Sequence, residues 1–405
     1  MSTVQSPASG SDFAPVYPSF EHAECPFPMF DRLRAESPVY KVPGREEFLV
    51  TRHEDLTFVT SHSEIFSSYP ADAPWSPGWS ETMIAKDPPD HTPLRKLIYR
   101  SFTPAKIRGL EPIVREVVDG LIDGFIDHGE MEFVTAFANP LSLLVTCRLL
   151  GLPREDASWL EHLVGTFEAQ AVRYHPIERQ ERQEANGAKL VEYLRAKVLE
   201  KLERPGDDVL SEVIANHTEA SGGAPNIEYL AVEANVLLAG GITTTAHMAA
   251  SAMSLLLRHP DQMELVQNDF SLIPRMVEEV IRLESPAQYQ PRYAVVDTEL
   301  GGVKIPRGSC LLILYSAANR DPERFSCPAD FDVRRTNVEK HVGFGHGPHF
   351  CIGAPISRLE GRISFEQLFT RLKDIRLAEG KNDFKHSPSL YFRAPSSLQL
   401  WFERA

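Results

Sequence analysis

The stretch 226–260 is apolar on nearly every side and constrains the fold more than any other part of the sequence. It begins after Asn226, a residue type that caps helices well, and ends at Pro260, which cannot continue a helix. A helix that is apolar all round normally runs through the core of a large protein. Gly240 and Gly241 in its middle cost roughly 1 kcal/mol each relative to alanine. We therefore expect one very long core helix whose backbone must be bare or opened at these glycines.

Most of the remaining chain also has a helical pattern. Apolar residues recur at three- and four-residue spacing in 104–129 and 188–205, which predicts two amphipathic helices. Short β-rich runs between 294 and 316 are punctuated by Gly-Gly and Pro-Arg-Gly, which predicts a small hairpin sheet. The stretch 389–402 could add strands. The expected fold class is mainly α with a small β part.

Composition narrows the classes of protein to consider. The polar, Pro/Ser-rich start predicts a flexible N-terminal arm over residues 1–20, and 21–405 shows no repeat or linker and is expected to form a single domain. A formal net charge of −14 argues against nucleic acid or an anionic membrane as the main partner, and we expect no membrane span. Five cysteines without CxxC spacing disfavour a disulfide framework and a structural zinc site. We expect a cytoplasmic protein.

The run HVGFGHGPHFCIGAP, residues 341–355, surrounds the lone Cys351 with glycine, proline and phenylalanine. A helix is expected to open near Pro355, and a cysteine just ahead of a helix N-terminus has a stabilised thiolate. Such a residue could be a metal ligand, a nucleophile or a structural thiol. The bulky Phe344 and Phe350 would shield the sulfur, which favours a ligand to a metal cofactor without excluding the other two.

The stretch from Phe344 to Gly353 is similar to the haem-binding signature of the cytochrome P-450 family, Phe-x-x-Gly-x-(basic)-x-Cys-x-Gly. The resemblance implies that fold, with haem b bound, Cys351 as the axial ligand of its iron, and Phe344, Gly345 and Gly353 among the residues around the cofactor. The thiol is then lone because the porphyrin supplies the other four ligands. The absence of CxxCH predicts that the haem is not covalently attached.

A second motif, EEVIRLESP, resembles the Glu-x-x-Arg motif of the family. An i,i+3 ion pair alone is common on any helix. The resemblance implies that Glu279 and Arg282 lock the core behind the haem together with a later basic residue, for which Arg335 in FDVRR is the candidate. Asp330 occupies the place where many relatives carry an arginine.

A third segment, 87–104, resembles the part of the family whose His and Arg hold the haem propionates. The resemblance implies His91 and Arg95, one helical turn apart, as two partners, and Arg292 and His349 as the others. Cations facing two carboxylates are chemically sensible, and arginine can bind them in a bidentate way.

From Gly240 onward the long helix is similar to the family's distal helix, where a small-residue pair opens the helix over the haem. The resemblance implies Thr244 as the catalytic threonine, but the preceding position, usually an acid, holds Thr243. A threonine can pass a proton but cannot store one near neutral pH. Either protons arrive through water and the hydroxyls of Thr243, Thr244 and Thr245, or activation is slow and releases hydrogen peroxide.

The substrate pocket can be carried over only by position. The resemblance predicts pocket residues in variable segments of the chain, namely Trp75, Trp79, Ala239, Ala287, Gln288, Tyr289, Leu390 and Tyr391. This set is aromatic and apolar, which predicts a neutral, compact, hydrophobic substrate. Parts of the sequence also look like bacterial terpenoid hydroxylases such as the camphor monooxygenase, and a small methoxy-aromatic fits as well.

The sequence contains no GxGxxG after a strand, flavin module or iron–sulfur cysteine cluster, so electrons must come from outside. Family analogy implies a ferredoxin and its NAD(P)H-dependent reductase, docking near Arg100 and Lys106. The expected function is a monooxygenase that hydroxylates or O-demethylates a small molecule with O2. Two alternatives stay open: a peroxide-using peroxygenase, and a haem gas or redox sensor without turnover.

Overall fold

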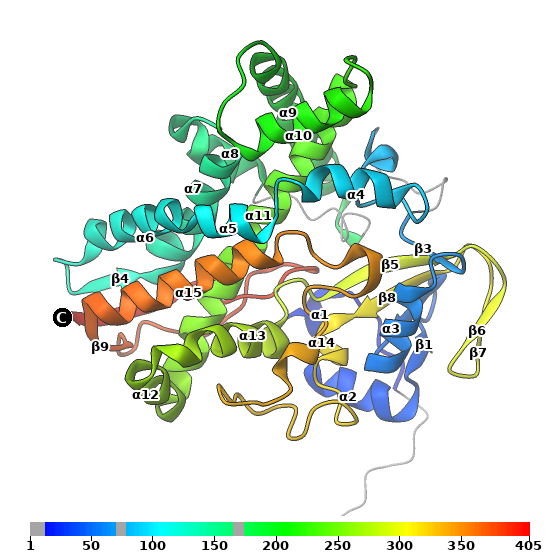
Figure 1. Cartoon of the computed structure of the whole chain (residues 1–405). Coiled ribbons are helices and arrows are strands. Elements are labelled where there is room, and N and C mark those ends of the chain that lie inside the picture. The colour runs from blue at the N-terminus through cyan, green and yellow to red at the C-terminus, as the bar shows by residue number, and fades with distance from the viewer. Residues whose placement is uncertain (1–12, 70–77, 165–173) are drawn as a thin grey trace, which may run out of the picture.

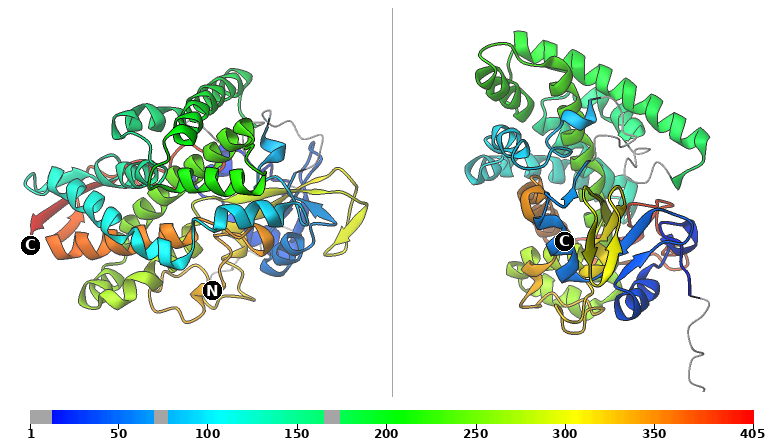
Figure 2. Two further views of the ribbon diagram at one scale, coloured as in Figure 1. Left: turned by 45° about the horizontal axis from the view of Figure 1, so that its top comes forward. Right: turned by 90° about the vertical axis from the view of Figure 1, so that its right-hand side faces the viewer.

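A computed structural model of the chain describes residues 13–69, 78–164 and 174–405. It shows a broad helical body on one side and a smaller β part on the other, with a two-stranded hairpin projecting from the sheet (Figures 1 and 2). The expected fold class, mainly α with a small β part, is therefore confirmed.

Helix α11, Ile227–Arg258, is the long core helix that the sequence predicts. The side chain of Asn226 caps it by accepting a hydrogen bond from the N–H of Tyr229 at 3.1 Å. The helix packs against several others, and 56% of its most apolar window is buried inside the protein. By length and composition alone it could cross a membrane, but burial of this kind is what a core helix shows.

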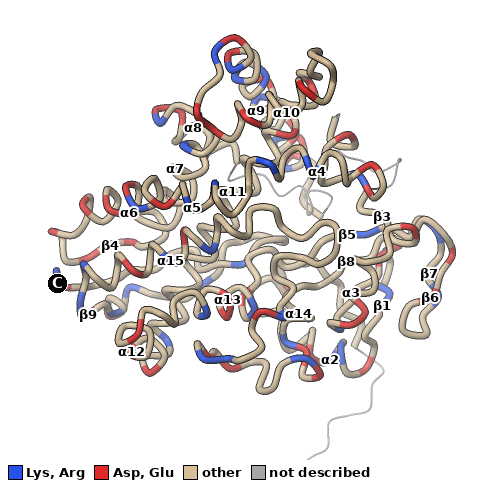
Figure 3. The backbone as a smooth tube through the Cα atoms, in the orientation of Figure 1, with Lys and Arg blue, Asp and Glu red and all other residues tan. Residues whose placement is uncertain are grey.

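The other helices of the body surround α11. They are α4 (His91–Tyr99), α5 (Pro104–Gly109), α6 (Glu111–Phe125), α7 (Asn139–Leu149), α8 (Ala157–Val164), α9 (Ile177–Glu203), α10 (Val209–Ala220), α12 (Pro260–Asn268), α13 (Ile273–Glu284) and α15 (Ala354–Arg371). Charged residues of both signs are mixed on the outer helices, such as α6 and α9 (Figure 3).

Two helix predictions need correction. The stretch 104–129 forms two helices, α5 and α6, because Pro112 lacks an N–H and its ring would clash with an earlier carbonyl inside a continuous helix. Pro112 stands instead in the first turn of α6, where its missing N–H costs nothing. The stretch 188–205 is the second part of α9, which begins earlier at Ile177.

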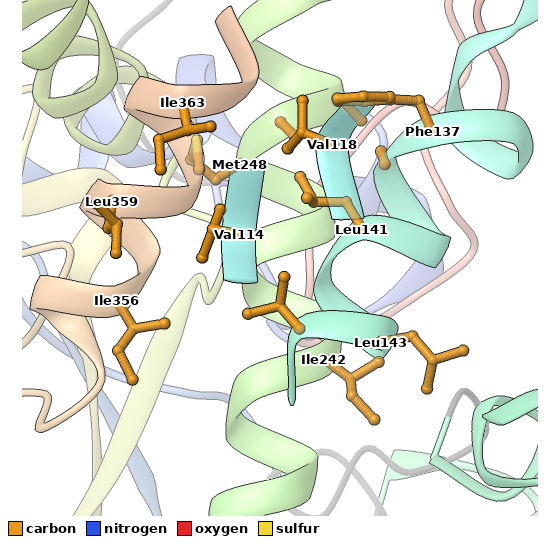
Figure 4. Packing of buried hydrophobic residues seen from close by; sticks show 14 of the residues in the cluster. Val114, Val118, Phe137, Leu141, Leu143, Ile242, Met248, Ile356, Leu359 and Ile363 are labelled. Carbon is orange, nitrogen blue, oxygen red and sulfur yellow. The ribbon is translucent and has the colours of Figure 1, made fainter. Parts of the chain in front are cut away.

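The core of the helical body lies between α6, α7, α11 and α15. Val114 and Val118 of α6 meet Leu141 of α7 and Met248 of α11, while Ile363 approaches from α15 (Figure 4). All five side chains are almost fully buried. This packing fixes the position of α11 relative to α15, the helix that follows the cysteine loop.

The main sheet has the order β1 (Val39–Lys41), β2 (Glu47–Val50), β8 (Cys310–Leu314), β5 (Tyr289–Ala294) and β3 (Phe66–Ser67). The projecting hairpin consists of β6 (Thr298–Leu300) and β7 (Val303–Ile305), as the pattern of 294–316 predicts. A second sheet has the order β4 (Glu130–Glu132), β10 (Gln399–Arg404) and β9 (Leu372–Leu377). Short helices α1 (Phe20–Ala23), α2 (Phe27–Glu36), α3 (His53–Ser61) and α14 (Tyr315–Ala318) accompany the β part.

The predicted N-terminal arm does not extend to residue 20. Residues 1–12 lie outside the described part of the chain. Tyr17, however, is only 3% exposed, and its ring packs edge-on against Phe30 of α2 and Tyr289 of β5 at 5.1 and 6.0 Å. The segment before α1 is therefore part of the core beneath the sheet.

Candidate active site

A cavity of about 360 Å³ lies between α11 and the loop that carries Cys351. From α11 it is lined by Gly240, Thr243 and Thr244, and from the loop by Phe344 and Cys351. The cavity thus joins the two regions that the sequence singles out, although they lie far apart along the chain.

The loop before α15 is folded tightly. Gly345 and Gly347 have φ angles of 77° and 72°, which residues with a Cβ rarely adopt. The N–H of Cys351 donates to the carbonyl of Phe344 at 2.8 Å and closes the loop. Gly345 and Gly353 line the cavity beside the cysteine. The glycines of the motif therefore give the backbone the shape that presents the thiol to the cavity.

Cys351 lies just ahead of the N-terminus of α15, as predicted. Burial raises the pKa of its thiol, and hydrogen bonds from the backbone N–H groups of Gly353 and Ala354 favour the thiolate and oppose that rise. Within residues 13–69, 78–164 and 174–405, no three His, Cys, Asp or Glu side chains gather as a metal site. A metal bound to this sulfur would take its remaining ligands from a non-protein group.

Two arginines, Arg95 and Arg292, line the cavity on the loop side. Arg95 Nη2 donates to the carbonyl of Phe350 at 2.6 Å, and Arg292 Nη1 donates to the carbonyl of Pro291 at 2.8 Å. A guanidinium has five N–H donors, so one backbone contact uses only part of its capacity. Both side chains can therefore also bind an anionic group in the cavity.

His91 and His349 stack beside the cavity with ring centroids 4.3 Å apart. The Nε2 atoms of both are buried and have no hydrogen-bond partner among the described residues, and Asp87 Oδ1 is 3.8 Å from His349 Nε2, too far for a hydrogen bond. Burial first, and then the charges of His349 and Arg95, lower the pKa of His91 to about 4. Carboxylates placed here would accept hydrogen bonds from the histidine nitrogens and pair with the two arginines, so the four predicted residues fit the propionates of a haem.

The α11 side of the cavity carries Thr243, Thr244 and Thr245. Thr244 Oγ1 donates to the carbonyl of Gly240 at 2.8 Å. The helix continues through Gly240 and Gly241, so the expected opening is not a break in it. A Cβ on Gly241 would lie 2.6 Å from Oγ1 of Thr146 in α7, whereas a Cβ on Gly240 would have no described atom within 4 Å. Gly241 thus permits close helix packing, and Gly240 leaves room over the cavity.

The Glu-x-x-Arg pair is buried and has the predicted third member. Arg282 Nε and Nη2 donate to Glu279 at 2.7 and 2.8 Å, and Arg335 Nε donates to Glu279 Oε1 at 3.0 Å. Glu279 and Arg282 are 0% exposed. Both arginines also donate to the carbonyl of Asp330 at 3.0 Å, so this residue contributes its backbone to the cluster.

Asn319 joins this cluster to the cysteine loop. Its carbonyl accepts from Arg282 Nη1 at 2.9 Å, and its side-chain Oδ1 accepts from the N–H of Val342 at 2.7 Å. Val342 lies two residues before Phe344. The cluster of Glu279, Arg282 and Arg335 is therefore connected through Asn319 to the backbone of the cysteine loop.

Four of the eight predicted substrate residues lie where the sequence places them. Trp79, Ala239, Ala287 and Tyr391 line the cavity. Trp75 lies outside the described residues.

The prediction is wrong for Gln288, Tyr289 and Leu390. Gln288 Nε2 donates to two carbonyls at the end of α13, at 2.9 and 2.5 Å. Tyr289 packs against Tyr17 and is 0% exposed, and Leu390 is buried in the core beneath the sheet. These side chains occupy the protein interior rather than the cavity wall.

Gln290 lines the cavity and was missed. Side chains alternate along β5, so Gln290 lies on the same face as Arg292, while Tyr289 lies on the other. Counting back two residues from Arg292 would have found it. Gln290 Nε2 donates to the hydroxyl of Tyr391, and the two form a polar pair in a mainly apolar wall.

Comparison with known proteins was made by sequence and by structure. A sequence model described as Cytochrome P-450 matches residues 161–392. The cytochrome P-450 monooxygenase PikC of Streptomyces venezuelae is 33% identical over 404 residues, covering 95% of this chain and 92% of PikC. The vitamin D(3) 25-hydroxylase of Pseudonocardia autotrophica is 34% identical and covers 93% of each chain.

Solved structures agree over almost the whole length. CYP109E1 from Bacillus megaterium in complex with testosterone superimposes with a TM-score of 0.87 at 26% identity, covering 95% of this chain and 99% of that one. P450BioI in complex with an acyl carrier protein ligated to hexadec-9Z-enoic acid gives a TM-score of 0.85 at 27% identity, with the same coverage.

Proposed function

Because the chain belongs to the cytochrome P-450 family of haem-thiolate monooxygenases, we propose that it hydroxylates or O-demethylates a compact hydrophobic molecule, with electrons from a separate ferredoxin. The observation that carries this proposal is the cavity that is lined by Cys351 on one side and by the threonines of α11 on the other. A cysteine thiolate on one side and hydroxyl groups on the other suit a flat cofactor between them.

Haem, when bound, supplies the iron that activates dioxygen. In the proposal Cys351 would supply the thiolate ligand to that iron, and His91, Arg95, Arg292 and His349 would hold the carboxylates of the haem. The two histidines have buried nitrogens without a described partner, and the two arginines and His349 line the cavity, which supports this role.

Residues of α11 and of the cysteine loop supply the polar and aromatic groups around the place of reaction. The hydroxyl of Thr244 donates to the carbonyl of Gly240, which leaves its oxygen able to accept a hydrogen bond from the cavity. Thr243 presents a second hydroxyl to the same space. Phe344 and Phe350 line the cavity beside Cys351.

The substrate class follows from the cavity wall. Trp79, Ala239, Ala287 and Phe392 give it an apolar surface, and Tyr391 with its glutamine partner adds a polar point. This composition supports a neutral hydrophobic substrate, such as a terpenoid or an aromatic ether, that carries at most one hydroxyl or carbonyl group. The names of two relatives, vitamin D(3) 25-hydroxylase and 6-deoxyerythronolide B hydroxylase, extend the range to larger hydrophobic molecules.

The electron donor is proposed to dock beside the cysteine loop in the cytoplasm. Arg100 and Lys106, on that side, form ion pairs with Glu219 and Glu212 of α10. An acidic ferredoxin would therefore compete with these glutamates. Replacing Glu212 with glutamine should lower the KM for the ferredoxin while leaving substrate binding unchanged.

The first experiment is a titration of the ferric Soret band of the holoprotein with panels of terpenoids, methoxy-aromatics and steroids. Displacement of a water from the iron by substrate gives a saturable shift, and the best ligand is then incubated with ferredoxin, its reductase and NADH. Product that contains oxygen from O2 supports the proposal. Shifts with none of the panels would reject a free hydrophobic substrate, and a carrier-bound one would be tested next.

A second candidate function, peroxide-driven oxygenation, is favoured by one observation: Thr243 stands at the position where an acid is usual. Hydrogen peroxide should then support product formation without ferredoxin, at a rate comparable to the NADH-driven reaction. A sensor without turnover finds no support, since the relatives are named monooxygenases and hydroxylases.

A further inference from the structure

We propose that His247 of α11 relays protons to the hydroxyls of Thr243 and Thr244, and so performs the task of the acid that position 243 lacks. The inference rests on the proposed monooxygenase function, because that reaction consumes protons: one oxygen atom enters the product and the other leaves as water. Electrons come from NADH, and the protons must cross the protein from solvent.

The helix places His247 close to both hydroxyls. It lies four residues after Thr243 and three after Thr244 in an unbroken helix, so the three side chains share one face, one turn apart. Gly240, which binds the hydroxyl of Thr244, is on this face as well. Gly240, Thr243 and Thr244 line the cavity, and His247 lies next to its wall, against the cavity residue Phe392.

The imidazole of His247 has an unused nitrogen. Its Nδ1 is buried and has no hydrogen-bond partner in the part of the chain that the structure describes. The ring packs edge-on against Phe392, a residue of the cavity wall, with centroids 5.4 Å apart and planes at 71°. A buried nitrogen without a partner is unfavourable, and a water shared with Thr243 would satisfy it. A side chain that only fills space against Phe392 would need no nitrogen here.

The protonation state of His247 suits a relay. Burial lowers the pKa of this side chain to about 4, so the imidazole is neutral at pH 7. A neutral imidazole has an N–H on one nitrogen and a lone pair on the other. It can accept a proton from a water at one nitrogen and give the other proton to the hydroxyl of Thr243, so that one proton enters and one leaves.

The charged groups nearby do not replace this relay. The acidic side chains of α11, Glu228 and Glu233, lie several turns away from His247. Arg393, next to Phe392, is bound to Glu284 at 3.0 Å. Glu360 of α15 also lines the cavity, but burial raises its pKa well above the ordinary value and so opposes release of its proton.

The main test is the variant His247→Asn, which keeps a polar side chain but cannot titrate. With a substrate that turns over, it should release severalfold more hydrogen peroxide and yield severalfold less product per NADH than the wild type. Ser251→Ala is the matched control, because Ser251 lies one turn further along the same face and its buried Oγ also lacks a described partner. This control should keep wild-type coupling.

Rescue separates a relay from a packing role. Adding Thr243→Asp to His247→Asn should restore product per NADH, because an acid is then present beside Thr244. If His247→Asn is uncoupled but not rescued, or if its coupling equals that of the wild type, the proposal is overturned.

A second readout does not depend on turnover. In the ferrous carbonyl form of the holoprotein, the labelled Cε1 resonance of His247 is identified by its loss in His247→Asn. Thr243→Val should shift the titration of that resonance. Thr245→Val should not, because Thr245, although it also lines the cavity, is only two positions from His247 and so does not face it on the helix. A wild type that forms no product would reject the proposed function, and the resonance would still decide whether His247 and Thr243 are linked: no shift in Thr243→Val would overturn the relay.

Discussion

Replacing Gly347 with alanine should destabilise the cysteine loop more than a strained backbone alone can explain. Its φ of 72° costs a residue with a Cβ about 1–2 kcal/mol. The new Cβ would also lie 2.6 Å from the carbonyl oxygen and 3.3 Å from the carbonyl carbon of Thr60, backbone atoms at the end of α3 that cannot rotate away. Relieving such crowding adds about 1–3 kcal/mol, so we expect a total loss of about 2–5 kcal/mol.

Gly302→Ala is the matched control for this change. Gly302 has a φ of 80° in the turn between β6 and β7, but no described atom lies within 4 Å of its Cβ position, so only the loss of about 1–2 kcal/mol is expected. Urea denaturation followed by tryptophan fluorescence gives both stabilities, and the Soret band gives the haem retained. Only Gly347→Ala should also lose haem. Equal destabilisation of the two variants would refute the idea that contact with α3 holds the loop.

Three further predictions concern charged and polar contacts. Glu279→Gln removes the carboxylate between two buried arginines and should cost about 3–5 kcal/mol in urea denaturation; a loss below about 1 kcal/mol would contradict the buried-pair argument. Burial opposes ionisation of Glu278, but hydrogen bonds from Arg358 and His341 hold its pKa at about 2. The ionised carboxylate therefore stabilises the folded protein fully above pH 4.5, and this contribution is lost as the pH falls towards 2. Glu278→Gln should flatten the dependence of unfolding free energy on pH in that window. Gln290→Leu should weaken Soret-detected binding of hydroxylated ligands by about 1 kcal/mol relative to their deoxy analogues, through loss of the contact with Tyr391; unchanged selectivity would reject a polar role for this pair.

The cysteine side of the site could be predicted because its geometry is local in the sequence. The loop and the start of α15 lie within a few residues of one another, and they include Gly345, Gly347 and Cys351. Each unusual backbone angle in this loop requires glycine at one position, so the sequence shows where the loop turns. The long helix α11 was equally visible, because an apolar surface on every side has few structural meanings.

The cavity wall could not be predicted in the same way. Ala287, Gln288 and Tyr289 follow one another, and the sequence does not show that α13 ends in a turn that pulls Gln288 back onto the helix carbonyls. The phase of β5 was decided by Tyr289, which packs into the core beneath the sheet and leaves Gln290 facing the cavity. Such choices depend on contacts between distant segments, and a one-residue error reverses every side chain of a strand.

The oxygen side of the site shows why residue type and position must be considered together. By sequence alone, Thr243 indicates that a proton-donating acid is missing, because an acid is expected at that position. His247 is then only one polar residue in a buried helix. On an α-helix, however, a proton-carrying group four residues along lies one turn away on the same face as the missing one. The buried, unpartnered Nδ1 of His247 and its contact with the cavity residue Phe392 turn that equivalence into a physical argument. In a core helix that is otherwise apolar, a titratable group can stand one turn away from its usual position and still serve the same cavity, provided that it stays on the same face.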